Sequence, residues 1–357
     1  MASQPQEPES SEGSYHGSSS SASSPPNSRS DITDEGLHTP EVKGPGQVVR
    51  VPDLFSSIMA AQPVVNPNYH KVKPEADAWI TEVIQADEKW SSRNCRVDLA
   101  FLASIWAPTC DEVALRMMID WNHWVKFDEG HLSRDPEAAQ EEINRTLAIM
   151  DNIEPPVRRE DNAIRYQQRW KAMHRQFFDG LLTQVKTMHD QRVFGRDVQE
   201  YLDMRRGTIG AYPAIALTEY ALGINLPAEV MRHPSCEEFM CISADLVLLV
   251  NDILSYKKDL ALGVDHNLIF LLRSQGLSIQ QAVDRIGEML EDCYKRWYTA
   301  LGNLDIWGEK VDKQVLSFAD ACRNVALGNL HWSFKTGRYL GPEGDQVHET
   351  RLLRLPE

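Results

Sequence analysis

Apolar residues recur at helical spacing along most of this sequence. In residues 75–89, for example, Trp79, Val83 and Ala86 repeat at intervals of four and three, which is the period of one face of a helix. The same pattern predicts helices over residues 96–106, 110–125, 137–153, 163–187, 192–206, 213–220, 227–231, 237–262, 279–301 and 310–332. Pro-rich connectors that end at Lys73-Pro74 precede the first helix.

Strand signals are nearly absent from the chain. It has no sustained two-residue alternation of apolar and polar positions and no Asn-Gly hairpin turn. It also lacks an internal repeat and an interior linker. We therefore predict an all-α fold, a single bundle-like domain of about ten or more helices over residues 46–357.

The first 45 residues differ in composition from the rest. They are rich in Ser, Pro and Gly and carry almost no apolar side chains. Such a segment buries too little apolar surface to offset the entropy lost on ordering, so residues 1–45 are predicted to be a disordered tail.

The charge of the chain excludes some classes of binding partner. The formal net charge is −15, whereas nucleic acids and anionic membrane surfaces attract a basic face. We therefore expect no nucleic-acid partner and no stable membrane anchor, and an anionic substrate would need bound cations to offset the charge. The oligomeric state stays open.

Cysteine usage and the N-terminus indicate the cytosol. The six cysteines form no CxxC pair and have no His at metal-ligand spacing, so buried thiols in a reducing compartment are predicted. The N-terminus lacks a secretory signal, and the longest apolar run, around residues 244–250, is shorter than the ~18 residues of a membrane span.

The residues best suited to bind a metal ion lie in one predicted helix. Asn251, Ser255 and Asp259 follow each other at intervals of four, which places them within about 80° of one another on one helix face. A carboxamide, a hydroxyl and a carboxylate are hard oxygen ligands suited to magnesium. The alternative is a polar helix end on which Asp252 and Asp259 are solvated, although the apolar run before Asn251 argues against it.

Two arginine-containing pairs of residues could bind an anion. Arg205-Arg206 ends one predicted helix, and Arg338-Tyr339 follows the last one. Arginine offers planar, multidentate donors to phosphate oxygens, and tyrosine adds a hydroxyl donor. Taken alone, either pair is more often surface charge than an anion site.

Together these segments resemble the class I terpene synthases, specifically the fungal sesquiterpene cyclases. The segment 251–259, NDILSYKKD, is similar to the family's second metal motif, Asn-Asp-x-x-Ser-x-x-Lys-Glu, with Asp259 in the Glu position. Arg205 matches the family's diphosphate-sensing arginine, and Arg338-Tyr339 matches its C-terminal pair. The resemblance covers residues 50–356.

The resemblance implies a site and a reaction. Asn251, Ser255 and Asp259 would ligate one Mg²⁺ of three, while Lys258 and the matched Arg and Tyr residues would contact the diphosphate. The substrate would be a linear allylic diphosphate, ionised and cyclised in an apolar cavity of the bundle. The resemblance favours farnesyl diphosphate and leaves geranyl and geranylgeranyl diphosphate open. Four aromatic residues are candidates to line that cavity: Phe101, Trp106, Phe127 and Trp332.

The first metal motif departs from the family's pattern. Where the family has an Asp pair before Phe-Asp-Glu-Gly, this chain passes directly from Val125 to Lys126 and Phe127, leaving Asp128 as the candidate catalytic ligand and Glu129 as a second. The stretch is shorter by about five residues, or about 7.5 Å and about 140° of helix. Three alternatives would each explain the shorter segment: natural divergence, lost activity, or a mis-spliced or mis-predicted exon boundary.

Three rival interpretations follow. The chain could be a catalytically silent homologue that binds a ligand, for which the shortened motif argues. It could be a prenyl-chain-elongating transferase, although that class carries two Asp-rich motifs. It could also be a helical interaction module in which the Asn251, Ser255 and Asp259 spacing is coincidental.

Overall fold

The computed structural model describes residues 46–132, 135–152, 160–190, 197–264 and 266–355. All of them belong to one unit, Asp34–Glu357. Within two of these stretches the backbone is described without the side chains, namely residues 126–131 and 160–164. The predicted tail, residues 1–45, lies outside the description.

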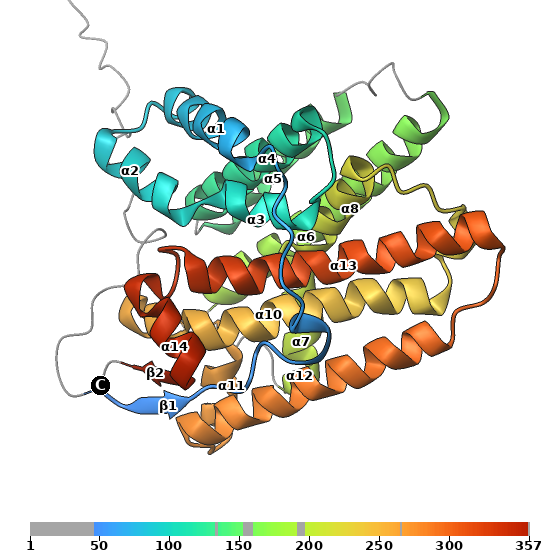
Figure 1. The fold of residues 1–357 in the computed structure, drawn as a ribbon. Coiled ribbons are helices and arrows are strands. Elements are labelled where there is room, and N and C mark those ends of the chain that lie inside the picture. Colours follow the sequence, from blue (N-terminus) through green and yellow to red (C-terminus); the bar gives the residue numbers. More distant parts are fainter. Residues whose placement is uncertain (1–45, 133–134, 153–159, 191–196, 265, 356–357) are drawn as a thin grey trace, which may run out of the picture. The chain divides into compact units, whose positions relative to one another are not determined.

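The described part of the chain is a helical bundle, as predicted. Its α-helices are α1 (Tyr69–Val83), α2 (Glu88–Val97), α3 (Leu99–Trp106), α4 (Glu112–His131), α5 (Pro136–Asn152), α6 (Glu160–His189), α7 (Val198–Thr208), α8 (Ala211–Ala221), α9 (Ala228–Met231), α10 (Pro234–Leu262), α11 (Leu268–Ser274), α12 (Ile279–Gly302), α13 (Glu309–Lys335) and α14 (Gly344–Thr350). Helix α10 lies between α12 and α13, and α13 also packs on α3 and α8 (Figure 1).

The central position of α10 follows from its composition. Residues 246–250 are all apolar and all buried, so this helix needs neighbours on every side. His233 caps its start, and Gly263, with φ of 65°, ends it in the left-handed conformation. Among the described helices, α10 is the one long and apolar enough to cross a membrane. The apolar run at residues 244–250 is too short to have predicted this. However, 83% of the most apolar window of α10 is buried inside the bundle.

Several boundaries differ from the sequence-based prediction. Pro74, assigned to a connector, lies inside α1, and the predicted helix 75–89 divides into α1 and α2. The break follows Gln85, whose φ is 53°, and Asp87 then caps α2 by accepting a hydrogen bond from the Trp90 amide. Helices α11 and α14 have seven residues each, too few for a periodic pattern to predict.

One small sheet was not predicted. Strands β1 (Val48–Arg50) and β2 (Leu352–Arg354) pair antiparallel, with Val49 opposite Leu353 and both buried. Three residues are too few to show alternation. The Gln280 side chain on α12 hydrogen-bonds the backbone N–H and C=O of Arg50, which joins this strand pair to the bundle.

All six cysteines are free thiols. Cys110, Cys236, Cys293 and Cys322 are buried, as predicted, whereas Cys241 is partly exposed and Cys95 is exposed.

Helices α6 and α7 approach closely where two glycines meet. A Cβ on Gly180 would lie 2.9 Å from the backbone oxygen of Gly207. A Cβ on Gly207 would instead meet the Gly180 Cα at 3.9 Å, an ordinary contact. The crossing therefore needs glycine at position 180 and tolerates a methyl group at 207.

We predict that Gly180→Ala lowers the free energy of unfolding by about 1–3 kcal/mol, because backbone must move to admit the methyl group. The matched control, Gly207→Ala, should be neutral or stabilising by up to about 1 kcal/mol, because alanine favours helix over glycine. Urea denaturation followed by circular dichroism measures both. Equal effects of the two substitutions would contradict the role of the close crossing.

Candidate active site

The C-terminal half of α10 carries the predicted ligand triplet on one face. Ser255 and Asp259 are buried, and Asn251 is partly buried. The Ser255 hydroxyl donates a hydrogen bond of 2.6 Å to Asp259 Oδ2. The solvated-helix-end alternative is wrong for both acids, because Asp259 is 8% exposed and Asp252 is 1% exposed.

Asp252 joins three elements. Its Oδ2 accepts hydrogen bonds from the Tyr201 hydroxyl on α7 at 2.5 Å and from the Leu268 amide at the start of α11 at 2.9 Å. Its Oδ1 lies 3.5 Å from Arg205 Nη2. Burial raises the pKa of Asp252, and the positive charge of Arg205, with the Tyr201 and Leu268 donors, opposes that rise. The carboxylate thus holds α7 and α11 against α10.

Arg205 lies where α7 meets the ligand face of α10. Its guanidinium Nη2 contacts Asn251 Oδ1 and Asp252 Oδ1, both at 3.5 Å, and Nη1 donates to the Thr208 hydroxyl at 3.2 Å. Burial alone would lower the pKa of Arg205, but Tyr201 and Asp252 outweigh it and raise that pKa above its ordinary value. A permanently charged donor therefore lies beside the first residue of the triplet.

Arg206, the neighbouring arginine, belongs to a different cluster. Its Nε lies 2.6 Å from Asp245, which also pairs with Arg296 at 2.8 Å. This buried ion cluster joins α7, α10 and α12. Only Arg205 of the basic pair faces the candidate site.

The C-terminal pair reaches the same place. Arg338 and Tyr339 lie just beyond the end of α13 at Lys335, and both are buried. Asn251 Nδ2 donates to the Tyr339 hydroxyl at 2.7 Å. The Lys258 ammonium lies 5.9 Å and the Arg338 guanidinium 5.3 Å from the centre of the Tyr339 ring. The structure therefore brings Arg205, Lys258, Arg338 and Tyr339 together with Asn251.

Helix α4 is continuous through residues 125–129, the segment interpreted above as a shortened first metal motif. It runs to His131, and its Trp121 and Trp124 pack against His174 of α6. Trp121 Nε1 donates to His174 Nε2 at 2.7 Å, and burial lowers the pKa of His174 to about 4, so the ring is a neutral acceptor. The side chains of residues 126–131, and with them Phe127, Asp128 and Glu129, lie outside the description.

The other aromatic candidates are buried and engaged in packing. Trp332 Nε1 donates to the Val97 carbonyl at 2.6 Å, and Lys335 lies 4.4 Å above the Phe101 ring. The Trp106 ring lies against Gly328 of α13 and 6.2 Å from the Trp121 ring. Trp332 and Phe101 thus hold specific structural contacts.

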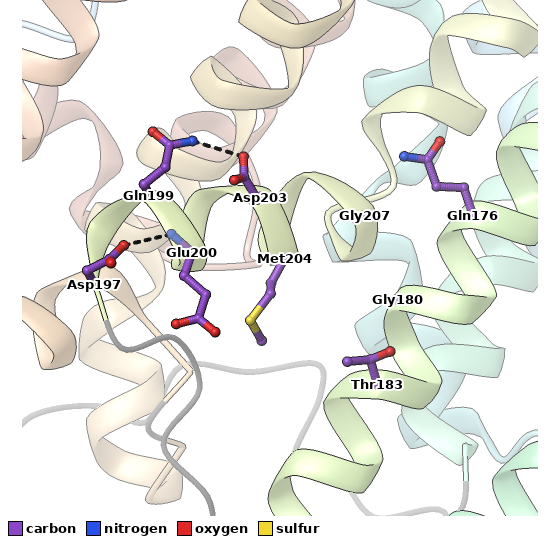
Figure 2. Close-up of a pocket in the computed structure, with 9 residues that line it drawn as sticks. All are labelled: Gln176, Gly180, Thr183, Asp197, Gln199, Glu200, Asp203, Met204 and Gly207. Carbon is purple, nitrogen blue, oxygen red and sulfur yellow. Dashed lines mark hydrogen bonds between the residues drawn. The ribbon is translucent and has the colours of Figure 1, made fainter.

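A separate cavity of about 920 Å³ opens between α6 and α7 (Figure 2). Its described lining is Gln176, Gly180, Thr183, Asp197, Gln199, Glu200, Asp203, Met204 and Gly207. None of the predicted site residues is among them. The cavity adjoins the Met204 and Gly207 face of α7, whereas Tyr201 and Arg205 contact α10.

Two residues that contact the candidate site were not predicted from the sequence. Tyr201 precedes Arg205 by one helical turn on the same face, a signal that could have been found. Asn267 donates to Asp259 Oδ2 at 3.1 Å from beyond the end of α10, and only the fold brings it there.

The triplet fits a divalent cation on its donor chemistry. Among the described residues, the two groups that hydrogen-bond the buried Asp259 carboxylate, the Ser255 hydroxyl and the Asn267 amide, are both neutral, and the charge of Arg205 also acts on this carboxylate. A buried carboxylate needs a positive partner, and oxygen donors suit a hard cation. The described residues contain no cluster of three or more His, Cys, Asp or Glu side chains placed to hold a metal, so this set depends on amide and hydroxyl oxygens.

The fold is that of terpenoid synthases. The crystal structure of α-eudesmol synthase matches it with a TM-score of 0.67, covering 76% of this chain and 96% of that one at 19% identity.

The sequence defines the family. The model for terpene synthase family 2, C-terminal metal binding, matches residues 108–296. The chain is 46% identical over 345 residues to a (1R,4R,5S)-(-)-guaia-6,10(14)-diene synthase of Fusarium proliferatum, which covers 87% of this chain and 86% of the relative. It is 45% identical over 345 residues, with the same coverage, to a Gibberella fujikuroi protein named as an inactive form of that synthase. The chain belongs to the terpene synthase family, whose C-terminal domain binds a divalent metal.

We predict that Tyr201→Phe lowers the free energy of unfolding by about 1–3 kcal/mol, because it removes a donor from a buried carboxylate. Tyr298→Phe is the control, since Tyr298 is exposed on α12. Chemical denaturation compares the two variants. A Tyr201→Phe protein as stable as the control would show that the Asp252 bond contributes nothing net.

Proposed function

We propose that the protein is a magnesium-dependent cyclase that ionises farnesyl diphosphate and closes the resulting allylic cation into a cyclic sesquiterpene hydrocarbon or alcohol. The observation that carries the proposal is the meeting of an oxygen-ligand face with four diphosphate donors at Asn251. Relatives named as terpene synthases support the same reaction class.

The candidate ligands come from two helices. Asn251, Ser255 and Asp259 of α10 would hold one Mg²⁺, and Asp128 and Glu129 of α4 would hold the others of a set of three. Position 128 follows Trp121 by seven residues (128 − 121), close to two helical turns, so α4 carries it on the Trp121 face. Bound cations supply positive charge that stabilises the departing diphosphate.

The basic residues act on the leaving group. Arg205, Lys258 and Arg338 offer charged donors and Tyr339 offers a hydroxyl. Because these groups are held by packing before substrate arrives, they require little reorganisation when negative charge develops on the diphosphate. Exclusion of water then protects the carbocation while the bundle shapes its closure. Aromatic faces such as that of Trp106 would stabilise the cation.

A silent homologue remains the second candidate. The shortened motif at Asp128 favours it, and a relative named as inactive shows that membership of the family does not guarantee turnover. In that case the site would still bind metal and diphosphate without releasing a cyclic product.

We assign residues 46–357 to the catalytic domain and residues 1–45 to a tail outside it. We also propose the cytosol as the location of the protein.

We predict that the purified protein converts farnesyl diphosphate with Mg²⁺ into a cyclic product detectable by mass spectrometry, and that EDTA abolishes this product. Asn251→Ala should reduce turnover by about 10²-fold or more, because it removes both a ligand and the partner of Arg205 and Tyr339. Asn303→Ala, at the exposed end of α12, is the matched control. Equal turnover of the two variants would refute the assigned site.

A second prediction addresses the shortened motif. If the wild-type chain gives no product, insertion of an Asp-Asp-containing pentapeptide between Val125 and Phe127 should restore one. A pentapeptide of the same length without acids is the control, because it restores helix register alone. If both peptides restore the cyclic product, the inserted acids are not required for turnover. If neither peptide restores it, the result favours the silent homologue.

A further inference from the structure

The connection after α10 returns one side chain to the ligand face. Gly263 ends α10 in the left-handed conformation, and the Val264 amide donates to the Asp259 carbonyl at 2.9 Å. Asn267 is the N-cap of α11, is 1% exposed as a residue and lies beside α10.

Hydrogen bonds to both the oxygen and the nitrogen of the Asn267 carboxamide fix its orientation. Its Oδ1 accepts the Ile269 amide at 3.0 Å, as the N-cap of α11. Its Nδ2 donates to the Asp252 carbonyl at 2.8 Å and to Asp259 Oδ2 at 3.1 Å, and lies 3.4 Å from Ser255 Oγ. A flipped amide would point its oxygen at a carboxylate and its N–H₂ at an N–H, so only this orientation satisfies both ends.

Both neutral donors engage the same oxygen of Asp259. The Ser255 hydroxyl and the Asn267 amide contact Oδ2, and Oδ1 is the oxygen that neither engages. Asp259 is one methylene shorter than glutamate, so its carboxylate has less freedom to find a cation. A donor that fixes its rotation therefore bears directly on whether Oδ1 points to the ligand.

We propose that Asn267 is a positioning residue for the metal site: it holds Asp259 by Oδ2 and presents Oδ1 to the cation. This inference rests on the proposed function, because it takes Asp259 as a metal ligand. Groups that orient metal ligands commonly contribute 10–100-fold to metal affinity.

The test separates positioning from capping. Asn267→Ser retains a capping hydroxyl for α11 and adds no charge, but it lacks the amide N–H that reaches Asp259. Ser278→Ala is the matched control, because it removes the N-cap of α12 away from the site. The full-length protein is titrated with Mn²⁺ in the presence of inorganic diphosphate by calorimetry, and thermal unfolding is measured beside it.

We expect Asn267→Ser to weaken Mn²⁺ binding by about 10-fold or more while the protein stays folded. Ser278→Ala should lower the melting temperature and leave Mn²⁺ affinity unchanged. Should Asn267→Ser fail to fold, Asn267→Thr provides the same comparison, since it also retains a capping hydroxyl and is uncharged, and it should also weaken binding.

Wild-type affinity in a folded Asn267 variant would overturn the positioning role and leave the proposed function intact. If the unmodified protein binds no Mn²⁺, the metal-site assignment fails and the positioning role fails with it. The two failures are therefore distinguishable.

Discussion

The need to satisfy polar groups inside an apolar helix organises this structure. Helix α10 is buried along most of its length and still carries Asp252, Ser255 and Asp259 at its C-terminal end. Burying a carboxylate without partners costs several kcal/mol, so other elements must supply donors. Tyr201 and Arg205 come from α7 and a backbone amide from α11, which places these elements around one point.

The same constraint links architecture to chemistry. The chain carries a net charge of −15, yet Arg205, Lys258 and Arg338 gather at the end of α10 where the proposed diphosphate would bind. Asn251 contacts both Arg205 and Tyr339, so the residues proposed for metal and for diphosphate adjoin in the protein itself. Charge neutralisation is therefore a local property of this site and does not follow from composition.

Helix α4 is continuous through the segment that the sequence analysis interprets as a shortened metal motif. Its middle is anchored by Trp121 and Trp124 against a neutral His174, and the helix continues unbroken to His131. A deletion inside a continuous helix moves everything beyond it by rise and rotation together. The position of Asp128 therefore depends on helix register more than on loop adjustment.

The sequence alone determined the all-helical class, the long periodic helices and the triplet on α10, because helical period and local spacing are properties of one segment. Only the tertiary structure decided that Arg205 faces the site while Arg206 pairs with Asp245, and that Asn267 returns to Asp259. It also decided the pairing of β1 with β2, which joins the two ends of the described chain. These contacts depend on which segments meet in space, and no local pattern contains that information.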